Sequence, residues 1–404
     1  MVFMLAILMN CMQQVDSIRP HTDSLRNKIL ALHIEGLVID SIRDVGAEYC
    51  LVAVSLPRDI KVQVWMPQKG WNGRFLGTGN GGSGGKILND KLAYGLKRGF
   101  ATANTDLGTS AGVNKSVHDP ERWADFGYRA THLMTVVGKQ VVTAYYGKPP
   151  HHSYFMGCST GGQQALMEAQ RYPEDYNGII AGAPANNRTH LHTQLLFNYL
   201  TTKGLFSNTD FTYLNAAQKA ALQKVRNGPV NPRTGEQIYC GIPAGSEQSD
   251  GGIGFFGGEN LLYPFRWVFG ADYDYRGFDF DKDLALIDSL LGPVLNANNP
   301  DLDTFKNAGG KLMMYTGTAD ALVPACDAMQ YYERVKDKKE FFRYFLIPGM
   351  CHCGGGAGIS DIGQNLQTVI KHDILQVMVE WVEDGVVPDK LMGADAQGNL
   401  QEIW

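Results

Sequence analysis

A serine stands at the centre of a short glycine-flanked motif that could perform nucleophilic chemistry. Residues 157–161 read Gly-Cys-Ser-Thr-Gly and fit the pattern Gly-x-Ser-x-Gly. A short apolar run at 153–156 precedes the motif and a stretch of helical character at 163–171 follows it, which predicts a strand, a tight turn and a helix. A turn of this kind raises the serine hydroxyl above a sheet. We therefore predict that Ser159 is the nucleophile of an acyl-transfer reaction.

Two later loops contain the residues that could activate this serine. A serine hydroxyl needs a general base, and the base needs an acid that orients it. After a nucleophile of this type the acid and then the base follow on loops after later strands. Apolar runs at 311–315 and 341–347 predict two such strands, and the loops after them contain Asp320 and His352. We predict these two as acid and base; Asp327 is the nearest rival acid, but it falls in a predicted helix.

A glycine-rich segment early in the chain could stabilise negative charge. Residues 77–85 read Gly-Thr-Gly-Asn-Gly-Gly-Ser-Gly-Gly and follow a short predicted strand. The oxyanion of acyl transfer needs two backbone N–H donors, one from the residue after the nucleophile and one from an early loop. We predict that Thr160 and Gly82 supply them. The segment has neither the Lys-Ser/Thr ending of a phosphate-binding loop nor the spacing of a dinucleotide site.

The order of the predicted elements indicates the fold class. Strand patterns at 49–65 and helical spacing at 125–146 belong to an alternation of strands and helices, which predicts a mainly parallel sheet covered by helices on both faces. Between 188 and 307 the chain becomes rich in aromatic residues, Asn, Asp and Gly, with weaker periodicity. We predict an α/β-hydrolase fold whose core, residues 1–187 and 308–404, carries an inserted lid domain at 188–307.

Composition excludes several classes of protein. In 404 residues the hydrophobic fraction is 44% and the charged fraction 19%, which argues against a disordered chain. The net charge is -5 and the basic residues are dispersed, so nucleic acid is not expected as a partner. An apolar run at residues 1–11 is too short to span a membrane, and it is either the remnant of a truncated signal or a packed segment. No membrane partner is expected.

These motifs together resemble the tannase and feruloyl esterase family, which also contains the plastic-monomer esterase MHETase. The resemblance rests on the serine motif, Asp320 and His352-Cys353, and it extends over nearly the whole chain through the segments 71–75, 79–82, 125–129, 182–185 and 278–281. It implies a serine carboxylic ester hydrolase acting on a small aromatic ester. We expect a feruloyl-type hydroxycinnamate ester, with a tannase for gallate esters and an MHETase-like aromatic ester hydrolase as alternatives. An inactive ligand-binding protein on a hydrolase scaffold is the alternative from another class.

The resemblance also implies disulfide bonds. In the family a bridge joins the cysteine before the serine to the cysteine after the histidine, here Cys158 and Cys353, and an N-terminal pair would be Cys11 with Cys50. Cys326 and Cys351 flank the acid and base loops, so a further bridge between them is an option that leaves Cys240 over. Disulfides imply a secreted or periplasmic protein.

The family's lid usually holds a calcium loop and contacts the substrate. Between residues 205 and 218 this chain has only Asp210 and no Asp-x-Asp-Gly run, so we predict no metal and no cofactor. A weaker alternative for calcium is the acidic stretch Asp272, Asp274, Asp279, Asp281 and Asp283. Phe256 and Trp267 could clamp a planar acyl ring and Arg266 could pair with a carboxylate or phenolate. The competing interpretation makes them lid core and a structural ion pair.

Overall fold

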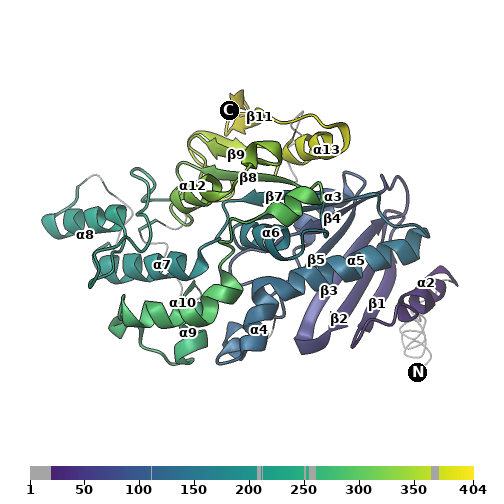
Figure 1. Cartoon of the computed structure of the whole chain (residues 1–404), viewed down its shortest axis with the longest axis horizontal. Helices are drawn as coiled ribbons and strands as arrows, with labels where there is room; N and C mark the ends of the chain where they lie inside the picture. Colours follow the sequence, from purple (N-terminus) through teal and green to yellow (C-terminus); the bar gives the residue numbers. More distant parts are fainter. Residues whose placement is uncertain are drawn as a thin grey trace, which may run out of the picture.

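Nine strands form one sheet that runs through the described part of the molecule (Figure 1). The computed structural model describes residues 20–110, 112–206, 211, 213–249, 252–253, 261–364 and 373–404. The strands are β1 (Val38–Val45), β2 (Tyr49–Leu56), β3 (Ile60–Pro67), β4 (Arg74–Thr78), β5 (Ala101–Thr105), β6 (His152–Cys158), β7 (Gly178–Gly182), β8 (Lys311–Gly317) and β9 (Phe342–Ile347).

The sheet is mixed, and the predicted catalytic residues follow strands of its parallel part. Its order is β1-β2-β3-β5-β4-β6-β7-β8-β9. Pairing is antiparallel from β1 through β3 to β5 and parallel from β5 to β9. All residues of β7 and almost all of β8 are buried, as expected for parallel strands covered on both faces. The prediction of a mainly parallel sheet is confirmed.

Alternate residues of the central strands contribute to two different hydrophobic cores. Phe75 and Phe155 point into the core that contains helix α5 (Ala130–Tyr146), whereas their neighbours Leu76 and Tyr154 belong to the core that contains helix α13 (Ile374–Asp384). Side chains of a strand alternate between the two faces of a sheet, so this division places helices on both sides.

The helices follow the predicted positions closely. Residues 120–146 form one continuous helical path of α4 (Pro120–Ala124), a π-helical turn at Asp125–Arg129 and α5, and α6 (Thr160–Arg171) follows the serine. None of the described helices is long and apolar enough to cross a membrane. The remaining helices of the sheet layers are α2 (Pro20–Leu30), α3 (Asn89–Leu96), α12 (Ala325–Arg334) and α13.

Between β7 and β8 the chain leaves the sheet for more than a hundred residues. Figure 1 shows α7, α8, α9 and α10 gathered at the end of the molecule away from β1. The described residues of this segment add no strand to the main sheet. The segment coincides with the predicted insertion, although the limits 1–187, 188–307 and 308–404 stay a prediction. Its helices are α7 (Arg188–Thr202), α8 (Ala216–Asn227), α9 (Tyr263–Phe269), α10 (Lys282–Leu295) and α11 (Asp303–Asn307).

The C-terminal region contains a small sheet that the sequence patterns did not indicate. β10 (Ile359–Asp361), β11 (Leu391–Asp395) and β12 (Leu400–Ile403) pair in that order. The helix expected at 365–384 is observed as α13, while residues 365–372 lie outside the described residues. β11 and β12 were missed because they are short and β12 is largely exposed, so apolar alternation is weak there.

A polar network fastens α13 to the sheet. Arg74 at the start of β4 donates through Nε and Nη2 to the two carboxylate oxygens of Glu383, at 2.6 Å each, and the Tyr154 hydroxyl donates to the same carboxylate at 2.6 Å. Burial alone would raise the pKa of Glu383, but the hydrogen bonds from Arg74 and Tyr154 outweigh it and lower the pKa to about 2. The charged form of Glu383 therefore stabilises the fold.

Glu383→Gln is expected to destabilise the protein by on the order of 2 kcal/mol at pH 7, because it removes a charged acceptor of three hydrogen bonds. A carboxylate whose pKa is depressed stabilises the fold above its ordinary pKa of about 4.3, and this contribution is lost as the pH falls toward 2. The difference from wild type in urea unfolding should therefore shrink over that range. The matched control is Glu402→Gln, which breaks an exposed ion pair with Lys390 and should cost less than about 0.5 kcal/mol. Equal losses in the two variants would contradict the assignment.

Candidate active site

Ser159 lies on the turn between β6 and α6. Its backbone has φ 65° and ψ -119°, a conformation that residues with a side chain rarely adopt. The Ser159 N–H donates to the carbonyl of Gly182 at the end of β7, at 3.0 Å, and Ala185 N–H donates to the Ser159 carbonyl at 3.2 Å. These bonds hold the turn in the strained geometry that the motif predicts.

Glycine allows three backbone segments to meet at this turn. A Cβ at Gly157 would lie 2.4 Å from the carbonyl oxygen of Gly161, and a Cβ at Gly79 would lie 2.5 Å from the Gly161 Cα. Real Cβ atoms do not approach so closely, so any side chain at these positions would push the segments apart. The loop after β4 can therefore pack directly on the first turn of α6.

Asp320 and His352 are joined by a hydrogen bond. The His352 Nδ1 lies 2.8 Å from an Asp320 carboxylate oxygen. The other oxygen of Asp320 accepts from the N–H groups of Leu322 and Val323, at 2.9 Å and 2.8 Å. Asp320 is fully buried after β8, and His352 follows β9. The carboxylate is thus fixed on three sides and can orient the imidazole with Nε2 free for a substrate or a serine.

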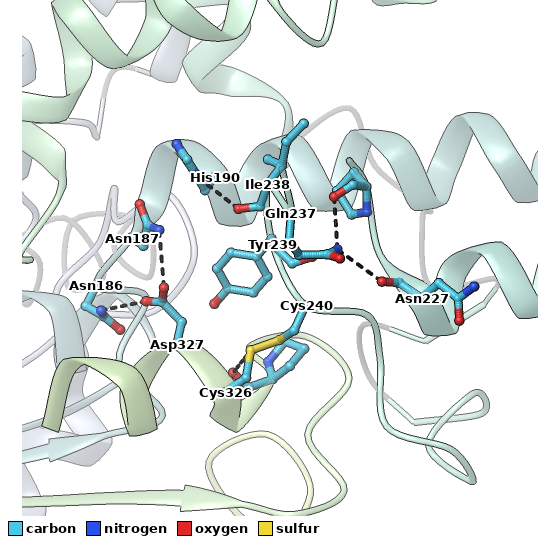
Figure 2. Close-up of a disulfide and its surroundings, with 12 residues drawn as sticks. Asn186, Asn187, His190, Asn227, Gln237, Ile238, Tyr239, Cys240, Cys326 and Asp327 are labelled. Carbon is cyan, nitrogen blue, oxygen red and sulfur yellow. Dashed lines mark hydrogen bonds between the residues drawn. A yellow bond between two sulfur atoms is a disulfide. The ribbon is translucent and has the colours of Figure 1, made fainter. Parts of the chain in front are cut away.

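The rival acid Asp327 is committed elsewhere. It lies on α12, where the side-chain amides of Asn186 and Asn187 donate to its carboxylate at 2.6 Å and 3.2 Å (Figure 2). Burial raises the pKa of Asp327, and the two asparagine hydrogen bonds oppose that rise. Asp320, and not Asp327, contacts the predicted base.

The two predicted oxyanion donors lie beside each other. The Thr160 hydroxyl donates to the Gly82 carbonyl at 2.6 Å, and the Gly161 N–H donates to the Asn80 carbonyl at 2.8 Å. The Asn80 N–H in turn donates to the side chain of Gln164 at 2.8 Å. Within the described ranges no acceptor pairs with the N–H of Thr160 or of Gly82. Both amides are therefore available to a ligand.

A cavity of about 350 Å³ collects these residues, within the range of small-molecule sites. Ser159, His352, Gly82 and Thr160 all line it. Asp320 lies behind His352 and is not part of the wall. Most of the remaining wall is apolar and includes Leu76, Met156, Leu191, Leu195, Leu261 and Val323.

Helix α7 supplies one wall of the cavity, which the sequence patterns did not predict. Arg188, Leu191, His192 and Leu195 line the cavity, and their spacing of three, four and seven residues places them on one helix face. The His192 Nδ1 bonds the carbonyl of Leu261. Burial, assisted by the charge of Arg188, lowers the pKa of His192 to about 3, so its ring is neutral at physiological pH. The helical spacing was the available signal, but it does not say what the face covers.

Two of the three predicted substrate contacts lie outside the cavity wall. Neither Arg266 nor Trp267 is among the residues that line the cavity. Trp267 is fully buried in α9, with ring centroids 5.4 Å from Phe126 and 4.7 Å from Tyr263. This position fits the lid-core interpretation, since a tryptophan packed on all sides has no face for a substrate. Phe256 lies outside the described residues.

The predicted bridge between the serine and histidine loops is present. Cys158 and Cys353 form a disulfide with a Cα–Cα distance of 5.9 Å across a sequence separation of 195. It joins the last residue of β6 to the residue after His352. The turn of the nucleophile and the loop of the base are therefore covalently connected.

A second disulfide corrects the proposed pairing of the remaining cysteines. Cys240 bonds Cys326 at the start of α12, so the option of a Cys326–Cys351 bridge with Cys240 left over is wrong (Figure 2). The reason is tertiary: Tyr239 packs in one hydrophobic cluster with Leu191 and Val323, which brings Cys240 onto α12. Cys50 is buried and bonds none of the described cysteines. Cys11 lies outside the described residues, so the Cys11–Cys50 pair stays a prediction.

The acidic stretch considered for calcium is occupied by protein contacts. Asp274 bonds Arg276, Asp281 bonds Arg233 and Asn231, and Asp279 accepts from backbone N–H groups at the start of α10. Among the described residues the clusters that could hold a metal lie elsewhere, at His151, His152 and Glu383 and at His132, Glu168 and Asp175. Asp210 lies outside the described residues, so the expected absence of metal and cofactor stays a prediction.

The chain is similar to known esterases in sequence and in structure. The family model described as tannase and feruloyl esterase matches residues 45–204 and 272–402. A probable feruloyl esterase B-2 of Neosartorya fischeri is 30% identical over 87% of this chain and 80% of that protein. Crystal structures of an esterase and of feruloyl esterase B, both from Aspergillus oryzae, superpose with TM-scores of 0.85 and 0.82. Each is 25% identical; the first match covers 95% of this chain and 94% of that chain, and the second covers 95% of each.

The double variant Cys158→Ala with Cys353→Ala is expected to fold but to lose turnover of p-nitrophenyl acetate by on the order of a hundredfold, because a displacement of about 1 Å at reacting atoms has that effect. The matched control is Cys240→Ala with Cys326→Ala, which removes the bridge between Cys240 and α12, leaves the Ser159 and His352 turns joined, and should lower thermal stability more than kcat. Circular dichroism would verify folding in both. Full turnover in the first variant would contradict the positioning role of the bridge.

Proposed function

The chain belongs to the tannase and feruloyl esterase family and is a carboxylesterase, and we propose that it hydrolyses aromatic esters of the hydroxycinnamate, feruloyl type through a serine acyl-enzyme. The observation that carries the mechanism is the common cavity of Ser159 and His352, with Asp320 hydrogen-bonded to the far side of the imidazole. The relatives named feruloyl esterase support the substrate class.

In the proposed mechanism Ser159 attacks the ester carbonyl while His352 takes the hydroxyl proton through Nε2. The negative charge that develops on the carbonyl oxygen is accepted by the N–H groups of Thr160 and Gly82. Asp320 stabilises the imidazolium, which then protonates the leaving alcohol. In the second half of the reaction His352 activates a water molecule, which cleaves the acyl-enzyme. This step releases the acid and restores Ser159.

The walls of the cavity support a hydroxylated aromatic substrate. Apolar side chains surround the space, and an aromatic ring gains from their contact. His192 adds a polar group to the wall. Its Nδ1–H donates to the Leu261 carbonyl, and among the described residues none donates to its Nε2. A neutral imidazole in this state accepts a hydrogen bond, and a phenolic hydroxyl is a donor that matches it. Tannase activity on gallate esters and MHETase-like activity are the alternatives of the same chemistry.

The complete arrangement of serine, acid and base speaks against an inactive binding protein. The serine keeps a strained backbone, which a binding protein would have no reason to retain. We also place the protein in an exporting pathway, secreted or periplasmic, because two disulfides persist only under oxidising conditions.

Ser159→Ala is expected to lower kcat for p-nitrophenyl acetate to below about a hundredth of wild type, because no other group in the cavity replaces the nucleophile. Ser360→Ala is the control, since that hydroxyl bonds the Ala394 carbonyl in the small sheet. Its activity should be unchanged. More than a hundredth of wild-type kcat in Ser159→Ala, with a normal thermal melt, would overturn the nucleophile and with it the mechanism.

Methyl ferulate is expected to be turned over with a kcat/KM at least about tenfold above methyl 3,4-dimethoxycinnamate, because only the first can donate a phenolic hydrogen bond to His192. His192→Phe should lower the ratio of the two kcat/KM values toward one, because it lowers kcat/KM for methyl ferulate. Methyl gallate and mono-hydroxyethyl terephthalate, measured beside them, separate the alternatives. A higher kcat/KM for either than for methyl ferulate would replace the proposed substrate class while leaving the serine mechanism in place.

A further inference from the structure

Arg188 is a buried cation without a buried counter-ion. It is the first residue of α7, only 2% exposed, and it lines the cavity. Within the described part of the chain no carboxylate lies within ion-pair distance of it, and its Nε has no hydrogen-bond partner. Its guanidinium instead lies 5.2 Å from the centroid of the Phe126 ring. Burying a charge among neutral groups is unfavourable for stability, so its retention at a reactive site calls for a role there.

The hydrogen bonds of Arg188 lead to the two oxyanion donors. Its Nη2 donates to the Thr160 hydroxyl at 2.8 Å, and that hydroxyl donates to the Gly82 carbonyl at 2.6 Å. Its Nη1 donates to the hydroxyl of Tyr263 in α9. The Thr160 hydroxyl oxygen therefore accepts a hydrogen bond from the Arg188 guanidinium, and its O–H donates a hydrogen bond to the loop after β4. Arg188 thus orients the hydroxyl that links the two segments carrying the N–H groups.

We infer, on the basis of the proposed function, that Arg188 is a positioning residue of the oxyanion hole, acting through the Thr160 hydroxyl on the Gly82 loop. Its uncompensated charge favours the negative oxygen that exists only in the transition state and the tetrahedral intermediate. Interactions of this kind raise kcat and leave ground-state binding nearly unchanged.

Direct capture of a substrate carboxylate fits the contacts less well. A carboxylate is held by two parallel N–H groups of a guanidinium. In Arg188 one N–H of each terminal nitrogen already donates to a hydroxyl group, of Thr160 or of Tyr263, and Nε is buried, so these two bonds fix the guanidinium toward the protein. The two roles differ in the kinetic parameter that they control, which an experiment can separate.

The test compares Arg188→Met, Arg188→Lys, Thr160→Val and the double variant Arg188→Met with Thr160→Val, all with neutral p-nitrophenyl acetate. Thr160→Val removes the hydroxyl and keeps the backbone N–H. We expect Arg188→Met and Thr160→Val each to lower kcat by on the order of 30- to 100-fold with KM within about threefold. Arg188→Lys should recover part of the loss. The double variant should resemble the single ones, because both act through one contact.

Arg171→Met is the control, since that exposed arginine of α6 lies outside the cavity wall and should leave both parameters unchanged. Should Arg188→Met fail to fold, Thr160→Val tests the same contact with the arginine in place. Unchanged kcat with a raised KM, or multiplied losses in the double variant, would overturn the inference. Loss of turnover in Ser159→Ala alongside full kcat in Thr160→Val and Arg188→Met would refute the role of Arg188 and leave the proposed function standing. Retained turnover in Ser159→Ala would refute both.

Discussion

Direct backbone contact between the first turn of α6 and the loop after β4 is the constraint on which the candidate site depends. The contact exists because Gly79, Gly157 and Gly161 present no side chains where the three segments meet. With the segments this close, the Gly161 N–H reaches the Asn80 carbonyl and the Thr160 hydroxyl reaches the Gly82 carbonyl. Everything else at the site is arranged around two amides whose separation this contact decides.

The parallel part of the sheet brings the candidate catalytic residues to that contact from distant parts of the chain. β6, β8 and β9 run in the same direction, so the turns that follow them emerge at one edge. Ser159, Asp320 and His352 each follow one of these strands, which makes their proximity a consequence of strand direction. The disulfides then add local precision where loops alone would be free to move: one joins the serine and histidine turns, and the other joins the segment between β7 and β8 to α12.

Features that depend on nearby residues were predictable from the sequence. The strained turn at Ser159 follows from a local motif, and the positions of Asp320 and His352 follow from the order of strands and loops; the structure has the turn and both loops at these positions. What a helix face covers could not be predicted in this way. The sequence of α7 indicates which residues share a face, but it does not indicate that this face closes a cavity above β6. Arg188 and His192 were missed for that reason, and Trp267, for which a substrate contact and a place in the lid core were both open, packs against Phe126. The pairing of Cys240 likewise depends on how the inserted helices dock, which spacing along the chain does not record.

The Cys158–Cys353 bridge closes a loop of the chain that contains the whole segment between β7 and β8 and the other disulfide. A protease that cuts the backbone once anywhere between these two cysteines leaves an uninterrupted covalent path from the first part of the chain to the last. The fragment that ends with the cut still carries Ser159, and the fragment that begins there still carries His352, yet the two remain one molecule. A single cut in the segment between β7 and β8 therefore leaves Ser159 and His352 on two fragments that are still joined by a covalent bond.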